Sequence, residues 1–383
     1  MKHGFLLIIL FAFLLLSCDG SHSPKGGNII TVNIPTIKNN FSENFDSLFE
    51  FKRFIILETN SDCLIKRVSK VSFYEKEIYI LDDREKKIYV FSNEGNYLRC
   101  YNHFGQGPGE YLSLSDFTIR GDTIYLLDRL GGKLLQYGLN DSLLNSQKVE
   151  KAKGIYVFPD AKFALNRELG SADNSVKNAY CSYILYDKKS KLSEEAPFNK
   201  YLCGYGVSLG DGANSFYAYD GSIYTFFPYN DTIYTIDNKK GNLHPYLTVG
   251  NGREKMFLGD DKKRVDKLRK ESLIPLIFSF YKWKKHLFFA YSYKEENFKF
   301  VLAEENGNIL YHGPLALDKN RLPIHPTAYD TDTSDRCLLS VINSFEILSI
   351  AEGRTQENKV LSEISNRMLQ DDNPVLVFYD VKF

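Results

Sequence analysis

Short apolar runs separated by polar turns recur along the chain, and the clearest copy reappears after 46 residues, from Ile78 to Ile124. In the first copy, residues 78–82 (Ile-Tyr-Ile-Leu-Asp) precede a charged turn and residues 88–91 (Ile-Tyr-Val-Phe), and the second copy has the same layout. A third copy begins at Ile223. The apolar positions recur with a period close to two, which predicts β-strands and excludes a solenoid of helical repeats.

Each copy predicts one four-stranded antiparallel unit. A further strand is expected before each pair, at residues 68–73, 116–119 and 216–219, and another after a Gly- or Asn-containing turn. Four strands in about 40–50 residues are typical of a β-propeller blade. Less regular units within 163–187, 278–311 and 337–379 bring the number of blades to six. Seven blades stay open as an alternative if residues 145–215 contain two.

The two ends of the chain predict how the ring closes. The last unit lacks a fourth strand, and residues 54–57 form a strand without a blade, so pairing the two would remove the open edges. Helical insertions are expected around residues 360–368, and the charged run 262–270 also interrupts the strands. The predicted fold is therefore all-β: a six-bladed β-propeller of four-stranded antiparallel blades, closed by an N-terminal strand joining the C-terminal blade, with short helical insertions.

The first residues have the features of an export signal. A positive start is followed by the apolar run 5–16, too short to span a bilayer as a helix, and then by Ser17-Cys18. This end resembles the bacterial lipobox, in which the cysteine is lipidated and becomes the first residue. We expect a signal peptide at 1–17, lipidated Cys18 with a flexible tether at 18–28, and the propeller at 29–383. The alternative is a secretory signal in which Cys18 is incidental.

Composition narrows the class of protein further. The 48 Lys+Arg residues balance 48 Asp+Glu, so nucleic acid is not an expected partner. Without Cys18 the cysteines number five and none is in a CxxC pair, which argues against a disulfide framework or a zinc site. A single disulfide stays open among these residues: Cys63, Cys100, Cys181, Cys203 and Cys337.

The sequence predicts no catalytic residues and no cofactor. The five histidines beyond the tether have no metal-ligand spacing, although a propeller can gather distant residues at its centre. Residues 330–335 (Asp-Thr-Asp-Thr-Ser-Asp) resemble the start of a calcium loop but lack the later Gly and Glu, so calcium is only an alternative. Asp82 and Asp128 occupy matching places in two copies and are expected to cap turns rather than to form a catalytic pair.

One glycine-rich motif stands between the first two predicted blades: Gly105, Gln106, Gly107, Pro108, Gly109, Glu110 and Tyr111. Glycine and proline suit a sharp turn from one blade to the next. A phosphate-binding loop is the functional rival, but it would open a helix, whereas an alternating segment follows here. We therefore interpret the motif as a structural inter-blade turn.

The motif resembles the inter-blade turn of NHL-type propellers. Together with the lipobox, Leu57-Glu58-Thr59 and residues 371–377 (Asp-Asp-Asn-Pro-Val-Leu-Val), it makes the chain similar to the six-bladed β-propeller lipoproteins of Bacteroidetes. The resemblance implies a cell-envelope protein anchored by lipid to a bacterial membrane, with the outer membrane expected, outside the cytoplasm.

The expected function is binding without catalysis. Propellers bind through loops at one mouth of the channel, and the abundant tyrosines suit a glycan, a peptide or an envelope-protein partner. The alternative is an enzyme similar to the lyases or hydrolases among NHL-like propellers, with a divalent metal in the central channel. A scaffold for a neighbouring membrane protein is a third hypothesis.

Overall fold

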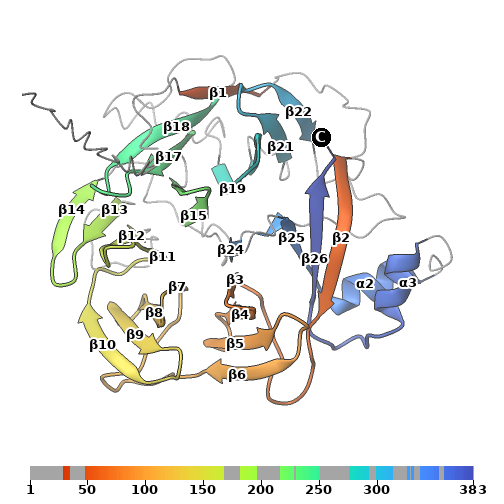
Figure 1. Ribbon diagram of the computed structural model, residues 1–383, viewed down its shortest axis with the longest axis horizontal. Coiled ribbons are helices and arrows are strands. Elements are labelled where there is room, and N and C mark those ends of the chain that lie inside the picture. The colour runs from red at the N-terminus through yellow and green to blue at the C-terminus, as the bar shows by residue number, and fades with distance from the viewer. Residues whose placement is uncertain are drawn as a thin grey trace, which may run out of the picture.

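Six separate β-sheets are arranged in a ring in the computed structural model of the protein (Figure 1). The structure describes residues 29–34, 48–167, 182–195, 216–227, 230–250, 276–292, 299–313, 326–327, 329–331, 337–352 and 358–382. The basic run 262–270 and Cys18 lie outside these residues. The number of blades is six, as predicted, because the described residues within 145–215 supply one sheet after β10.

The strands of the first three blades, from the inner to the outer strand, are β3 (Lys70–Tyr74), β4 (Glu77–Asp82), β5 (Lys87–Ser92), β6 (Tyr97–Tyr101); β7 (Asp116–Arg120), β8 (Thr123–Asp128), β9 (Lys133–Gly138), β10 (Leu143–Lys148); β11 (Gly154–Val157), β12 (Phe163–Arg167), β13 (Ser182–Tyr186), β14 (Lys191–Glu195). Those of the last three are β15 (Phe216–Tyr219), β16 (Ser222–Phe226), β17 (Thr232–Ile236), β18 (Leu243–Gly250); β19 (Leu276–Trp283), β20 (His286–Ser292), β21 (Lys299–Glu304), β22 (Ile309–Gly313); β23 (Pro326–Thr327), β25 (Leu338–Ile342), β26 (Val375–Val381), β2 (Phe49–Ile56).

The middle strands of each blade are apolar on both sides because each blade is covered by its two neighbours. In β4, Ile78, Tyr79, Ile80 and Leu81 are all buried. Ile78 and Ile80 belong to a cluster shared with the last blade, whereas Tyr79 and Leu81 belong to one shared with the second. Continuous apolar runs in these strands therefore reflect burial on both faces of the sheet.

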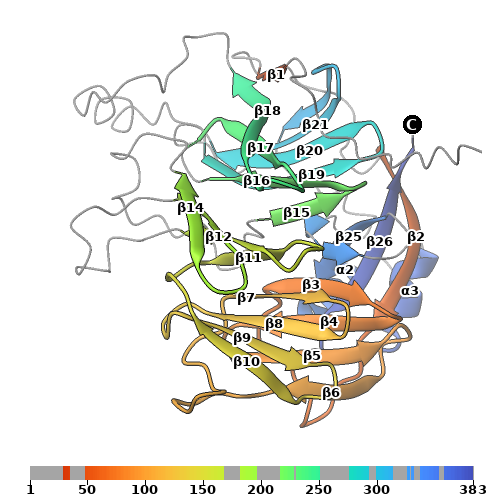
Figure 2. The same ribbon diagram turned by 60° about the vertical axis from the view of Figure 1, so that its left-hand side comes forward.

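The ring closes through the N-terminal strand, as predicted. β2 pairs antiparallel with β26, with Phe54 opposite Val377 and Phe49 opposite Val381, and Figure 2 shows the two strands side by side. The chain's two ends thus complete one sheet, β2-β26-β25-β23, and the last blade gains its fourth strand.

Two further strands were not predicted, and both pair in parallel with a neighbouring blade. β24 (Tyr329–Thr331) follows β23 of the last blade but pairs with β3, the inner strand of the first. The ring is therefore closed a second time, on its inner side. β1 (Ile30–Asn33) pairs with β18 and covers the outer edge of the fourth blade.

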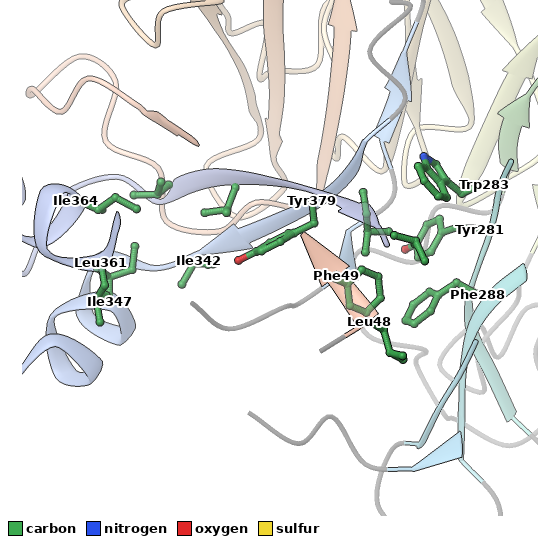
Figure 3. Close-up of a cluster of buried hydrophobic side chains, with 14 of the residues drawn as sticks. Leu48, Phe49, Tyr281, Trp283, Phe288, Ile342, Ile347, Leu361, Ile364 and Tyr379 are labelled. Carbon is green, nitrogen blue, oxygen red and sulfur yellow. The ribbon is translucent and has the colours of Figure 1, made fainter. Parts of the chain in front are cut away.

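Two short helices connect β25 to β26 outside the ring (Figure 1). α3 (Lys359–Ser365) was predicted; α2 (Ser344–Ala351) was not. Figure 3 shows Ile347, Leu361 and Ile364 of these helices in one buried cluster with the last blade. Among the described residues, no helix is long and apolar enough to cross a membrane.

Candidate binding face

The connections between strands divide the propeller into two unlike faces. In an antiparallel blade, the connections between consecutive blades and those from the second to the third strand end at the same face. We call this the loop face; it includes residues 57–69, 102–115 and 343–374. The opposite, turn face carries the other hairpins, which are as short as residues 75–76 or 121–122. Binding residues of propellers come from the connections between strands, so the longer connections of the loop face make it the better candidate for a binding surface.

The glycine-rich motif lies on the loop face and connects β6 to β7. Residues 107–110 form a turn in which the Glu110 N–H donates to the Gly107 carbonyl at 3.1 Å, with Pro108 at its second position. The Glu110 carboxylate folds back and accepts from the Gly107 N–H at 2.7 Å. A side chain on Gly105 would displace this carboxylate from its place beside the Gly107 N–H.

Tyr111 fastens the motif to the first blade. Its ring is fully buried, and its hydroxyl donates to the Lys86 carbonyl at 2.7 Å and accepts from the His103 N–H at 3.1 Å. Burial raises the pKa of this phenol. On the other side, Lys133 Nζ donates to the Glu110 carbonyl at 2.6 Å, so the motif is held by both blades that it joins.

Replacing Tyr111 by phenylalanine is expected to lower the free energy of unfolding by about 1–3 kcal/mol, because two partly buried backbone groups lose their partner while the ring stays. Chemical denaturation measures the change. Tyr125→Phe is the matched control, since the Tyr125 side chain is only half-buried. Equal losses in the two variants would contradict the role assigned to the Tyr111 hydroxyl.

Asp82 and Asp128 are fully buried, and each binds the backbone on both sides. Asp82 accepts from the N–H groups of Arg84 and Glu85 in the following turn and from Lys66 and Arg67 before the blade. Asp128 accepts from Gly131 in its own turn and from Leu112 and Ser113. Each carboxylate therefore joins a turn to the inter-blade segment, and the two act in separate blades rather than as a pair.

A buried ion pair connects the inner strands of the first three blades. Lys70 Nζ lies 2.7 Å from Asp116 Oδ1 and also donates to the Phe117 carbonyl at 2.7 Å. Asp116 Oδ2 accepts from the Ile155 N–H at 2.8 Å. Sequence reasoning missed this pair, although Lys70 and Asp116 are 46 residues apart and occupy the same place in consecutive copies. The repeat period was the signal that could have found them.

The two motifs at the ends of the propeller meet at Asn373, whose side chain is fully buried. Its Oδ1 accepts from the Ile65 N–H at 2.8 Å, and its Nδ2 donates to the carbonyls of Glu58 and Cys63. The Asn373 N–H donates to Thr59 Oγ1 at 2.8 Å. The residues 57–59 and 371–374 that carry the family resemblance thus form one clasp beside the closing strand.

The described histidines lie in three blades: His103 follows the first blade, His244 is in β18 of the fourth, and His286 and His312 are in β20 and β22 of the fifth. His312 Nε2 is 2.7 Å from the Tyr291 hydroxyl, and burial lowers the His312 pKa to about 4. Burial also lowers the pKa of His286. His103 stacks on Tyr137 at 4.3 Å between ring centroids, and its Nε2 is 2.7 Å from Asp141. No group of three metal-binding side chains occurs among the described residues.

The remaining candidates are placed only in part. Cys63, Cys100 and Cys337 form no disulfide among the described residues, and burial raises the pKa of the Cys63 thiol. Cys181, Cys203 and most of the calcium-like run lie outside the described residues. Of that run, Asp330 and Thr331 are described as part of β24, which pairs with β3.

Six four-stranded antiparallel sheets form a ring, and the N-terminal strand β2 closes it by pairing with β26 of the last blade. The protein is therefore a six-bladed β-propeller. The chain belongs to the DUF4934 family, a domain of unknown function whose model matches residues 29–380. No curated protein sequence matches the chain.

Solved structures resemble the chain at low sequence identity. A candidate exported protein from Bacteroides fragilis is 19% identical with a TM-score of 0.71, covering 93% of this chain and 100% of its own. A DUF4221 member from Bacteroides vulgatus is 8% identical (TM-score 0.48; 87% and 98% covered), and virginiamycin B lyase from Staphylococcus aureus is 13% identical (TM-score 0.41; 76% and 81% covered). The first of these likenesses supports the fold, and none carries a function to this chain.

Proposed function

We propose that the protein is a lipid-anchored propeller of the bacterial cell envelope that binds a glycan, a peptide or an envelope protein through its loop face. The observation that carries the proposal is where large apolar side chains are exposed. Five of them project from loop-face connections: Leu64, Phe104, Leu130, Phe345 and Leu369. The other five lie at β1 or on outer strands, and none of the described ones lies in a turn-face connection.

The exposed fractions of these side chains are large, from 45% for Leu64 to 74% for Leu369. Scattered single apolar residues need no partner, but those that stand in connections between strands all lie on one face, which supports a recognition surface there. Phe104 is also covered by the Lys86 ammonium, 3.7 Å from the ring centroid. An aromatic ring with a cation beside it suits a polar partner that has flat apolar faces, such as a sugar or a peptide.

The buried charges support binding rather than catalysis. The carboxylate oxygens of Asp82, Asp128 and Asp116 accept hydrogen bonds from backbone N–H groups or from Lys70. A general acid or base needs a lone pair or proton that can reach a substrate. The lipobox-like end at Cys18 supports export and anchoring, and with them a propeller that acts outside the cytoplasm.

A ligand scan tests the proposal. The melting temperature of the mature protein is measured with panels of oligosaccharides and peptides, with calcium and with a chelator. A true ligand at a hundredfold its dissociation constant should add about 2.7 kcal/mol of stability. Loss of stability with chelator would instead favour the metal-dependent enzyme, and a uniformly flat response would direct the search to pull-down of envelope proteins.

Binding of the ligand or partner found in this way should depend on the loop face. Phe104→Ser and Leu130→Ser are expected to weaken binding by about tenfold or more each, because buried apolar anchors carry much of the energy of an interface. Leu192→Ser is the matched control, since Leu192 is 49% exposed on the outer strand β14. A loss with Leu192→Ser alone would overturn the assignment of the face.

A further inference from the structure

The direction of β1 shows from which side the chain reaches the propeller. β18 is the fourth strand of its blade, so it starts at the turn face and ends at the loop face. β1 runs parallel to it, with Ile30 opposite Leu247 and Asn33 opposite Gly250. Ile29, the first described residue, therefore lies on the turn-face side of β1.

Contacts with the fifth blade support this placement. The β21–β22 turn, residues 305–308, belongs to the turn face, and Gly307 in it has a φ of +88°. A side chain on Gly307 would collide with the Thr31 carbonyl, so β1 passes directly over this turn. Figure 1 shows β1 at the outer rim of the ring, beside β18.

Three lysine pairs lie on the turn face of the third, fourth and fifth blades. They occupy the β13–β14, β17–β18 and β19–β20 turns of three consecutive blades: Lys188 and Lys189, Lys239 and Lys240, Lys284 and Lys285. All six side chains are exposed. Neighbouring blades contact each other on this face, since Lys162 Nζ of the β11–β12 turn donates to the Lys239 carbonyl at 3.2 Å and the Lys284 N–H donates to the hydroxyl of Tyr219 in β15 at 2.7 Å.

The carboxylates on the same side are mostly engaged. They are Asp160, Asp187, Asp220, Asp237, Glu304, Glu305 and, near the end of β26, Asp380. Asp187 and Asp237 accept from backbone N–H groups within their own turns, whereas Asp160 pairs with Lys162 and Glu305 with Lys282. Of the six exposed lysines, only Lys284 pairs with a described carboxylate, Asp380 at 3.4 Å.

The turn face of the first two blades has the opposite character. Its hairpin residues include four exposed carboxylates, Glu75, Glu94, Asp122 and Asp141, and one exposed lysine, Lys76. The turn face around the blade that carries β1 therefore differs from that of the first two blades in its many exposed lysines, although the whole chain has no net charge.

We propose that the turn face around the fourth blade docks on an anionic membrane surface and directs the loop face away from the membrane. The proposal rests on the lipid anchor of the proposed function. Residues 19–28 between Cys18 and Ile29 can span at most about 33–36 Å, so an anchored chain keeps this face near the bilayer. A single lipid chain binds weakly, and a polybasic surface is a usual second signal for stable membrane attachment.

Trp283, the only tryptophan in the chain, reports the docking. It precedes Lys284, whose Nζ lies 4.1 Å from the indole centroid. We would reconstitute the mature lipidated protein in vesicles with dansyl-labelled headgroups and measure energy transfer from Trp283. Transfer is expected to be strong with 30 mol% phosphatidylglycerol, a fraction of about this size giving a clearly anionic surface, and weak with phosphatidylcholine alone or at about 1 M salt.

Charge reversal tests which lysines act. At about 1 kcal/mol per lysine near an anionic surface, Lys188→Glu/Lys189→Glu or Lys239→Glu/Lys240→Glu should lower the ratio of docked to undocked protein by about 30-fold or more. Arg84→Glu/Lys148→Glu is the matched control, because both residues are exposed on the loop-face side and the change in net charge is the same. Unchanged melting temperatures establish that the variants fold.

The outcomes separate this inference from the proposed function. A mature chain whose mass lacks the lipid would refute the anchor itself. A lipidated chain with equal transfer in neutral and anionic vesicles, or a control variant that loses as much transfer as the lysine variants, would overturn the docking face and leave the binding function standing. Loss confined to the turn-face variants supports the proposal.

Discussion

Replacing Lys70 by methionine is expected to lower the free energy of unfolding by about 3–5 kcal/mol. The side chains of Lys70 and Asp116 are only 9% and 8% exposed. Without the ammonium, the Asp116 carboxylate stays buried with its charge uncompensated, and the Phe117 carbonyl loses a donor. Methionine keeps most of the packing volume, so the loss measures the removed charge and hydrogen bonds rather than a cavity.

Urea denaturation of the full chain measures this change. Lys52→Met is the matched control, because Lys52 pairs with Glu50 on the exposed surface and such pairs contribute about 0–1 kcal/mol. The double variant Lys70→Met/Asp116→Asn should recover part of the loss, since the amide keeps an acceptor for the Ile155 N–H without a buried charge. Similar losses for Lys70→Met and Lys52→Met would show that the buried pair is not needed between the blades.

The blades could be predicted because their pairing is local. β4 and β5 are joined by the short turn 83–86, so their alternation and their register appear within one window of sequence. β1 and β24 could not be found in this way. Each is only three or four residues long and pairs in parallel with a strand more than 200 residues away, so nothing in the neighbouring sequence encodes the partner.

α2 was missed for a different reason. Its eight residues, Ser344–Ala351, are mostly apolar and hardly differ from those of the strand before it. α3 was predicted because Leu361 and Ile364 lie three apart and a proline follows downstream. Short apolar segments cannot be assigned by periodicity alone, and packing against the last blade decides the outcome here.

The candidate surfaces depend on strand direction more than on motifs. The three lysine pairs are evident in the sequence, but they share a face only once each hairpin has been placed as a first-to-second or third-to-fourth connection. The exposed apolar residues are likewise ordinary one by one. Their common face follows from the topology, which turns scattered residues into two opposed surfaces with different chemistry.

Replacing Asn373 by alanine is expected to cost about 3–5 kcal/mol, as large an effect as that at Lys70. The amide has no exposed surface and satisfies the Ile65 N–H and two backbone carbonyls. Each buried polar group left without a partner costs about 1–3 kcal/mol, and the loop can relax to recover part of the sum. The loss should appear in the cooperative unfolding of the whole ring, because these bonds join residues about 310 positions apart.

Two comparisons make the test specific for the clasp. Asn145→Ala removes the same amide from the exposed strand β10 and should change stability by less than about 0.5 kcal/mol. Thr59→Val removes the hydroxyl that accepts from the Asn373 N–H and should cost about 1–2 kcal/mol. If Asn373→Ala behaved like Asn145→Ala, the strand pairs β2–β26 and β24–β3 would hold the ring closed without this contact, and the meeting of residues 57–59 with 371–374 would contribute little to stability.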